Sequence, residues 1–287
     1  MPHIQKALVN SRDQSNSPMT ILDLAIRAYM KDKDEWSSHV TLDSKFIDIL
    51  VEQLKLFMLT SHASTVTVLS YMFYILNTNP KILAAVRREH DKIFGLNPDT
   101  VTAKLATDPT LLNQLPYTSA VIKETLRLYP PVGTFRAGSA NFHLVHPETR
   151  ERYPTEGMMV YGCTQTAQRI EAFWPEPNRC IPERWLVPED DLLHPPQNAF
   201  RPFELGPRNC IGQEIVQLEL RLILAMTVRE FDIISHYPTG GPHVLGDVAY
   251  MTKQPGQLSG YPKDGMPVRV RYRENDVNTL RVGYQKT

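Results

Sequence analysis

A long helical run in the first third of the chain constrains the possible folds more than any other feature. Residues 41–80, TLDSKFIDILVEQLKLFMLTSHASTVTVLSYMFYILNTNP, contain no glycine, and their only proline is the last residue, Pro80. Because proline disfavours a helical conformation in the residue before it, the sequence predicts one very long helix over about 42–79. The stretch from Phe46 to Leu59 is apolar on nearly all sides, which predicts a helix that crosses the middle of the fold.

Shorter helices and small strands are predicted along the rest of the chain. Apolar residues at helical spacing indicate helices at 18–31, from Pro80 to about Ile93, at 115–131, and from Cys210 or Ile211 to about 230. Alternating stretches around FHLV and GMMVYGC are typical of strands, and PVRVRY near the C-terminus indicates a terminal hairpin. The sequence therefore predicts a mainly α fold with small β-sheets, of the α+β class, in a single domain over 1–287.

Composition excludes several classes of protein. The 287 residues balance 31 lysines and arginines against 31 aspartates and glutamates, so neither a nucleic acid nor an anionic membrane is indicated as a partner. No run of about 18 uninterrupted apolar residues occurs, and the N-terminal residues have no apolar signal core, so we expect no membrane span. Three widely spaced cysteines without a CxxC pair indicate neither a zinc site nor a disulfide framework, and they fit a reducing, intracellular compartment.

The segment FELGPRNCIGQE, residues 203–214, places Cys210 at the start of a predicted helix. Backbone N–H groups and the helix dipole favour an anion there, and so favour the thiolate form of the side chain. A thiolate in this position could act as a nucleophile, a redox thiol or a metal ligand. A cysteine hydrolase would need a histidine brought close in space, and a redox thiol usually needs a resolving partner. A single cysteine ligand indicates a cofactor that supplies the other ligands itself, as haem does with its four porphyrin nitrogens.

Neighbouring residues favour the haem interpretation over the ordinary case, in which a lone cysteine is a small buried apolar side chain. Gly206 would allow a sharp turn, Gly212 would let a flat macrocycle approach, Arg208 would pair with a propionate, and Phe203 would shield the sulfur from water. The pattern F-x-x-G-x-R-x-C-x-G resembles the haem-ligand signature of the cytochrome P-450 family, the haem-thiolate monooxygenases. The resemblance implies that Cys210 is the axial ligand of a haem iron.

Two further motifs are similar to elements of the same family. KETLRLYP carries Glu124 and Arg127, which match the family's E-x-x-R, and IPERW supplies Arg184 of its P-E-R element. Taken alone, Glu124 and Arg127 would be a surface ion pair worth roughly 0.2–0.5 kcal/mol. The resemblance instead implies one buried structural cluster of the three residues. PPVGTFRAG resembles the segment that lines the substrate pocket, and its Arg136 matches an arginine that meets a haem propionate; the alternative is a solvated loop residue.

The long helix departs from the family pattern at the oxygen-binding position. TSHAST, residues 60–65, stands where the family has A/G-G-x-D/E-T-T/S. Ser64 matches the alcohol that donates a hydrogen bond to oxygen, and Thr65 the hydroxyl after it, so both are candidate catalytic residues; alternatively they only bond back to helix carbonyls. Ala63 replaces the carboxylate that brings protons. Gln168 replaces the histidine of a His-Arg pair, and we expect this to be a minor change in a packing loop.

The resemblance runs from about residue 18 to 275 but covers only the later part of a full family member, so we expect the N-terminal portion, with its membrane anchor and lid helices, to be missing. A truncated product, or a partner chain that completes the fold, would explain this. The haem-ligand loop and its following helix would occupy about 203–230.

The resemblance implies a monooxygenase that inserts one oxygen atom from dioxygen into a lipophilic substrate, with electrons from a separate NADPH-dependent reductase. The motif wording is similar to fungal members that act in secondary metabolism, and full-length relatives sit at the endoplasmic reticulum membrane. The alternative is a truncated, non-catalytic remnant that binds haem weakly or not at all.

Overall fold

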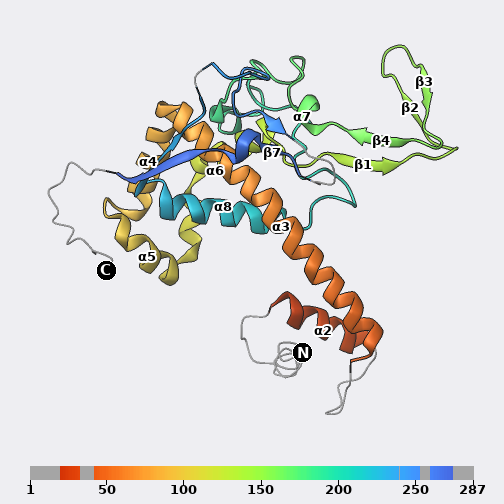
Figure 1. Ribbon diagram of the computed structural model, residues 1–287, viewed down its shortest axis with the longest axis horizontal. Coiled ribbons are helices and arrows are strands. Elements are labelled where there is room, and N and C mark those ends of the chain that lie inside the picture. Colours follow the sequence, from red (N-terminus) through yellow and green to blue (C-terminus); the bar gives the residue numbers. More distant parts are fainter. Residues whose placement is uncertain (1–19, 33–41, 239, 253–258, 274–287) are drawn as a thin grey trace. The chain divides into compact units, whose positions relative to one another are not determined.

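The computed structural model describes residues 20–32, 42–238, 240–252 and 259–273. Within these ranges the protein is mainly helical and contains four two-stranded antiparallel sheets (Figure 1), which confirms the predicted fold class. Contacts divide the chain into two compact units, Met1–Thr60 and Ser61–Thr287. The single domain expected from the sequence therefore stays a prediction.

The first unit contains helix α2, Ile21–Asp32, and the start of helix α3. The Thr20 backbone N–H donates to the Asp23 carboxylate at 2.7 Å, and the Asp23 N–H donates to the Thr20 hydroxyl oxygen at 3.2 Å. This reciprocal cap explains why the helix begins at Ile21. The hydrogen bonds from Thr20 hold the pKa of Asp23 below its ordinary value.

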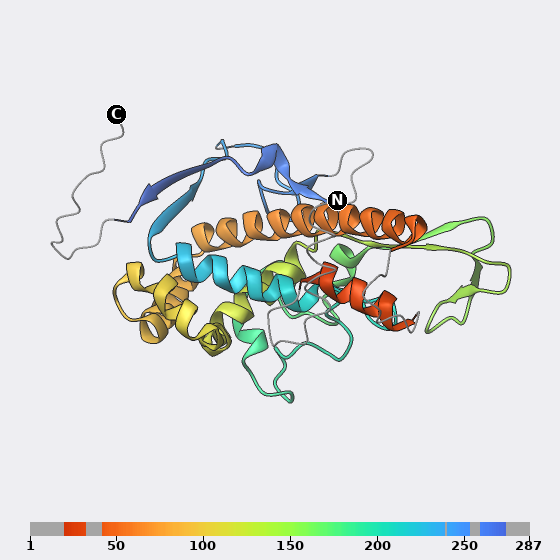
Figure 2. The ribbon, with the colours of Figure 1, turned by 90° about the horizontal axis from the view of Figure 1, so that it is seen from below.

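Helix α3, Ser44–Thr78, is a single helix of 35 residues, which confirms the long helix predicted over 42–79. Its second half carries Val68, Met72 and Leu76 into the main core, which also contains Leu220 and Leu224 of helix α8, Gln213–Thr227. Figure 2 shows α8 alongside this half of α3. The expectation that Phe46–Leu59 crosses the middle of the fold holds only for its start. Phe46 packs against Ile26 and Met30 of α2, and Leu50 is buried. At the other end of the stretch, Met58 is 74% exposed and Leu59 60%.

The length and composition of α3 also bear on the membrane. Among the described residues, α3 alone is long and apolar enough to cross a bilayer, so the expectation of no membrane span is not confirmed. A core helix of a soluble protein can meet the same criteria, and the second half of α3 contributes Val68, Met72 and Leu76 to the main core.

The second unit holds most of the regular structure. After α3 come helices α4, α5, α6, α7 and α8 and short 3₁₀ segments: α4 Pro80–Phe94, η1 Pro98–Thr100, α5 Val101–Thr107, η2 Pro109–Gln114, α6 Pro116–Leu128, α7 Thr164–Ala167, η3 Pro182–Trp185, α8 Gln213–Thr227 and η4 Lys263–Gly265. Prolines open α4 and α6, where their missing N–H is not needed. The start predicted for α8, at Cys210 or Ile211, is two or three residues early, because Gly212 caps the helix and its carbonyl accepts from the Val216 N–H at 3.0 Å.

The strands pair locally with one exception. Strand β1, Thr134–Ala137, pairs with β4, Met159–Gly162; β2, His143–Val145, with β3, Arg152–Pro154; β6, Met251–Thr252, with β7, Tyr261–Pro262; and β5, Phe231–Ser235, with β8, Val268–Tyr272. The strands expected around FHLV and GMMVYGC are therefore present, and β1 and β4 lead into β2 and β3 as one ribbon (Figure 1).

The terminal hairpin predicted at PVRVRY is wrong. Strand β8 pairs with β5, directly after α8, and the β6–β7 segment lies between them in the sequence. Side chains fix this register: the rings of Phe231 and Tyr272 lie 5.0 Å apart, and Asp232 accepts from both Arg87, at 2.8 Å, and Arg271, at 3.4 Å.

Candidate functional site

The Cys210 loop, defined here as residues 203–212, is closed by its own backbone. The Cys210 N–H donates to the Phe203 carbonyl at 2.8 Å, and the Asn209 N–H donates to the Gly206 carbonyl at 3.1 Å. Gly206 has a φ of +80°, a left-handed conformation that glycine adopts without steric penalty. The loop therefore has a defined shape that ends directly before α8.

The face of the loop that carries the thiol is open. Cys210 and Arg208 are exposed, and a side chain in place of Gly212 would meet only the Cys210 sulfur, at 3.9 Å. Ile211 is 84% exposed, and Ile215 and Leu218 of α8 are also exposed. The Cys210 thiol and the apolar stripe, defined as Ile211, Ile215 and Leu218, are therefore exposed surface that a flat apolar group would cover. Phe203 packs against the main core.

Arg136 lies on β1, next to the chain segment after α6. Its side chain is exposed, and its guanidinium donates to the Phe135 carbonyl at 2.8 Å. Strand β1 contacts the Cys210 loop two residues earlier, where the Thr134 hydroxyl donates to the Glu204 carboxylate. The structure therefore brings the strand of Arg136 to the loop of Arg208 and Cys210.

The two candidate hydroxyls on α3 differ in burial: Ser64 is half-buried and Thr65 is buried. The buried Thr67, which the sequence did not single out, joins this part of α3 to two distant segments. Its hydroxyl lies 3.1 Å from the Ala63 carbonyl and 2.9 Å from the Gly260 carbonyl, and the Gly260 N–H donates to the Pro131 carbonyl at 2.7 Å. No local pattern could reveal a partner so far along the chain.

Replacing Thr67 with valine should lower the free energy of unfolding by about 1–2 kcal/mol, because the Gly260 carbonyl would lose its donor in a buried place. Chemical denaturation measures the change. Ser70→Ala is the matched control: its hydroxyl donates only to the Val66 carbonyl of its own helix, at 2.8 Å, so its midpoint should stay close to that of the parent protein. Equal effects of the two substitutions would show that the Gly260 contact contributes nothing.

Glu124, Arg127 and Arg184 form one cluster with no exposed surface. Both carboxylate oxygens of Glu124 accept from Arg127, at 2.7 and 2.9 Å, and one also accepts from Arg184 Nε at 3.2 Å. Burial lowers the pKa of Arg184, and the Glu124 carboxylate opposes that shift. The surface ion pair considered for Glu124 and Arg127 is therefore not what the structure holds.

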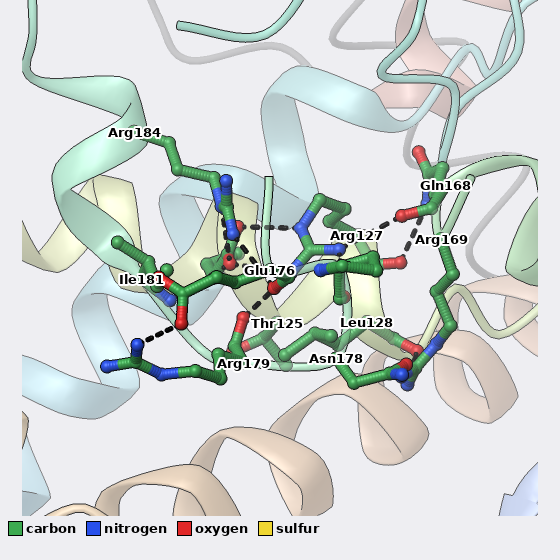
Figure 3. A network of polar contacts seen from close by, with 12 residues as sticks. Thr125, Arg127, Leu128, Gln168, Arg169, Glu176, Asn178, Arg179, Ile181 and Arg184 are labelled. Atoms are coloured by element: carbon green, nitrogen blue, oxygen red, sulfur yellow. Dashed lines mark hydrogen bonds and ion pairs between the residues drawn. The ribbon is translucent and has the colours of Figure 1, made fainter. Parts of the chain in front are cut away.

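The two arginines of this cluster also hold the loop that follows α7. Arg127 donates to the carbonyls of Pro177 and Arg179, and Arg184 donates to those of Pro175 and Glu176 (Figure 3). Residues 175–179 form no helix or strand, so these side chains replace the backbone partners that regular structure would provide.

Gln168 is more than the minor change expected from the sequence. It has no exposed surface, and its side-chain amide donates to the carbonyls of Leu126, at 3.1 Å, and Arg127, at 3.0 Å. Figure 3 shows Gln168 beside Arg127. Its side-chain oxygen accepts from the Arg201 N–H at 2.7 Å, two residues before the Cys210 loop. The only sequence signal for this role was the departure itself, glutamine where the family has histidine.

The donor set of the described residues fits a haem and no independent metal ion. They contain no group of three or more histidine, cysteine, aspartate or glutamate side chains that could hold a metal. All three cysteines are free, and burial raises the pKa of Cys180, which keeps it a thiol. Cys210 thus offers a single thiol on an open face, which suits a cofactor that brings four ligands of its own.

Two hollows in the described residues contain none of the predicted site residues. One, of about 210 Å³, lies where the end of α3 meets α4 and β5, and includes Arg87 and Asp232. The other, of about 780 Å³, lies beside the start of α4 and includes Tyr117 and Cys180. Neither of these two hollows includes Cys210, whose side chain lies on the exposed face described above.

Comparison with known proteins gives the family to which this mainly helical fold and its exposed thiol loop belong. The family model for cytochrome P450 matches residues 3–258. The chain belongs to the cytochrome P450 family. A crystal structure of a cytochrome P450 (CYP102L1) superposes with a TM-score of 0.66 at 22% identity, covering 95% of this chain and 55% of that one.

Several of the curated relatives are fungal. The chain is 35% identical over 271 residues to cytochrome P450 monooxygenase polC of Polytolypa hystricis, covering 91% of this chain and 48% of that protein. It is 31% identical to acrF of Aspergillus aculeatus, covering 89% of this chain and 56% of that protein. The chain thus spans about half the length of these relatives. Cytochrome P450 monooxygenase PC-23 of Penicillium crustosum is 33% identical over 207 residues, which cover 71% of this chain and 99% of PC-23.

Proposed function

We propose that this chain carries the haem-binding part of a monooxygenase that inserts one oxygen atom from dioxygen into a lipophilic organic substrate. The observation that carries the proposal is the exposed Cys210 thiol, held in a closed loop at the start of α8 within a cytochrome P450 fold. Electrons would come from a separate NADPH-dependent reductase. The fungal relatives named monooxygenases support a role in secondary metabolism, and three free cysteines support an intracellular location.

The residues around Cys210 suit the two parts of a haem. The Cys210 sulfur would be the axial ligand, and the N–H groups at the start of α8, a helix of 15 residues, favour its negative charge. Arg208 and Arg136 would donate to the propionates. The apolar stripe of Ile211, Ile215 and Leu218 would be covered in the assembled protein. When bound, the haem supplies the iron that reacts with dioxygen.

Ser64 and Thr65 would serve the oxygen-binding side of the site. Each has a hydroxyl that can donate a hydrogen bond, whereas Ala63, in the place of the family's carboxylate, has no proton to give. Proton delivery would then depend on these hydroxyls and on water. Such a site would bind and orient oxygen while it moves protons more slowly than a site with a carboxylate.

The absence of that carboxylate favours a second candidate, a non-catalytic haem-binding remnant or one that holds no haem. One experiment separates these functions. The full chain is expressed, titrated with hemin, and its ferrous carbon monoxide spectrum is recorded. We expect stoichiometric haem with a thiolate-type spectrum, and Cys210→Ala should abolish the thiolate signature.

Cys163→Ala is the matched control, because Cys163 is also an exposed cysteine but lies outside the loop. It should keep the parent spectrum. A protein that binds no haem, or a Cys210→Ala variant with an unchanged spectrum, would refute the proposal. If the protein binds stoichiometric haem with a thiolate spectrum but oxidises no lipophilic compound when a reductase is supplied, the result would support the non-catalytic remnant.

A further inference from the structure

The segment that enters the Cys210 loop is held from both sides through one residue, Arg201. Its backbone N–H donates to the Gln168 side-chain oxygen at 2.7 Å, and its guanidinium donates to the Glu204 carboxylate at 2.9 Å. The other oxygen of that carboxylate accepts from the Thr134 hydroxyl of β1. These four residues, Gln168, Arg201, Glu204 and Thr134, form a continuous chain of contacts that we name the loop brace.

One end of the loop brace is fixed in the core. The Gln168 amide uses both of its N–H donors, on the carbonyls of Leu126 and Arg127 at the end of α6, while its oxygen accepts from Arg201. A neutral imidazole has one donor and one acceptor, so a histidine could not make these three bonds. Glutamine is therefore the residue type that this arrangement requires.

The other end of the loop brace is a strained backbone. Glu204 has a φ of +58°, a left-handed conformation that a residue with a side chain rarely adopts. Such a conformation persists when its surroundings compensate for it, and here the carboxylate contacts with Arg201 and Thr134 do so.

Glu204 is adjacent to the residue that closes the loop. The Phe203 carbonyl accepts the Cys210 N–H at 2.8 Å, so a shift of Glu204 would move the acceptor that positions Cys210. We propose that the loop brace positions Cys210 by tying its loop to helix α6 on one side and to strand β1 on the other. Its members are positioning residues, and their effect on haem rests on the function proposed above.

Hydrogen exchange of the haem-free chain tests the loop brace directly. Thr134→Val and Glu204→Gln each remove or weaken a contact, and the amides of residues 201–210 should exchange about ten-fold faster, the effect of losing one net hydrogen bond. Thr134→Ser keeps the hydroxyl and should restore the parent rate. Gln168→Met should have the same effect from the other end, if the variant folds.

The Glu204→Gly variant separates the loop brace from backbone strain alone, because the two predict opposite changes in the exchange rate. Glycine relieves the left-handed strain, so strain alone predicts slower exchange, whereas the loop brace predicts faster exchange. Glu176 is the matched control: it also has a positive φ, of +49°, and pairs with an arginine three residues away, Arg179, on an exposed surface. Glu176→Gly should slow exchange of its own segment. A Glu204→Gly variant that behaves in the same way would overturn the proposal.

The ferrous carbon monoxide spectrum of the haem-loaded protein distinguishes positioning of Cys210 from a general effect on stability. After hemin titration, Thr134→Val and Glu204→Gln should raise the proportion of thiol-type over thiolate-type species in the ferrous carbon monoxide spectrum, and Thr134→Ser should not. Unchanged proportions together with unchanged exchange would overturn the loop brace. If the parent protein itself shows no thiolate-type spectrum, the proposed function fails, and the exchange rates still decide whether the loop brace exists.

Discussion

Replacing Glu124 with glutamine should lower the free energy of unfolding by about 3–5 kcal/mol. The carboxylate has no exposed surface and accepts from five donors: two of Arg127, one of Arg184, the Ile181 N–H and the Trp185 indole N–H. Glutamine has nearly the same volume, but it removes the charge that neutralises two buried guanidinium groups. It also turns one acceptor into a donor that would face other donors.

Urea denaturation followed by circular dichroism measures this loss for the full chain. Glu52→Gln is the matched control, because Glu52 forms an i,i+3 ion pair with Lys55 on the exposed side of α3. Its removal should leave the unfolding midpoint unchanged, as for most surface pairs. A Glu124→Gln variant with the midpoint of the parent protein would show that the cluster does not stabilise the fold.

Local signals explain why the helices were predictable. Pro80 separates α3 from α4, and the capping and apolar spacing of each helix lie within its own residues. The register of β8 against β5 depends on Asp232, Arg87 and Arg271, which come from three separated segments. The sequence therefore predicted a local hairpin, whereas β8 pairs with the more distant strand β5.

The candidate site divides in the same way. The Cys210 loop has a local signature, because its turn, its closing hydrogen bond and the start of α8 all lie within 203–213. Thr67, Gln168 and Glu204 gave no such signal, since each acts through a partner on another element. The exposure of Met58 and Leu59 could not be predicted either, because apolar character indicates a need for cover and not its source.

The loops of this protein depend on buried side chains more than on backbone pairing. Arg127 and Arg184 donate to four carbonyls within 175–179, and Gln168 adds the contact to Arg201. The loop brace thus contacts the Glu124 cluster where Gln168 and Arg127 hydrogen-bond each other at the end of α6. Damage to the cluster should therefore reach the Cys210 loop, which links the largest stability effect to the proposed haem site.

Lowering the pH from 7 to 5 should destabilise the protein by about 2 kcal/mol through one residue, His90. This histidine of α4 has no exposed surface, and its Nε2 lies 2.9 Å from the Thr118 hydroxyl. That hydroxyl donates to Glu89 at 2.6 Å, so its oxygen accepts from a neutral Nε2–H. Burial, and then the charge of Arg229, lower the pKa of His90 to about 3.

The sign follows from the proton count. Between about pH 6.5 and pH 3 the unfolded chain binds a proton at His90 and the folded chain does not, so stability falls as the pH falls. His90→Gln keeps an N–H that can donate to Thr118 but does not titrate. The free energy of unfolding of this variant should therefore fall by about 2 kcal/mol less between pH 7 and pH 5 than that of the parent protein. The comparison stops at pH 5 because carboxylates contribute increasingly below it.

His62→Gln is the control, because the exposed ring of His62 is hydrated both before and after unfolding. If the parent and His90→Gln proteins show the same change in unfolding free energy between pH 7 and 5, His90 must take up its proton without unfolding. The Arg229 guanidinium and the closed packing against Phe94, whose ring lies 5.9 Å from the imidazole, would then have to open locally in the folded state. Hydrogen exchange at α4 would detect that opening. In either case, equal changes in the two proteins would refute His90 as the source of the acid sensitivity.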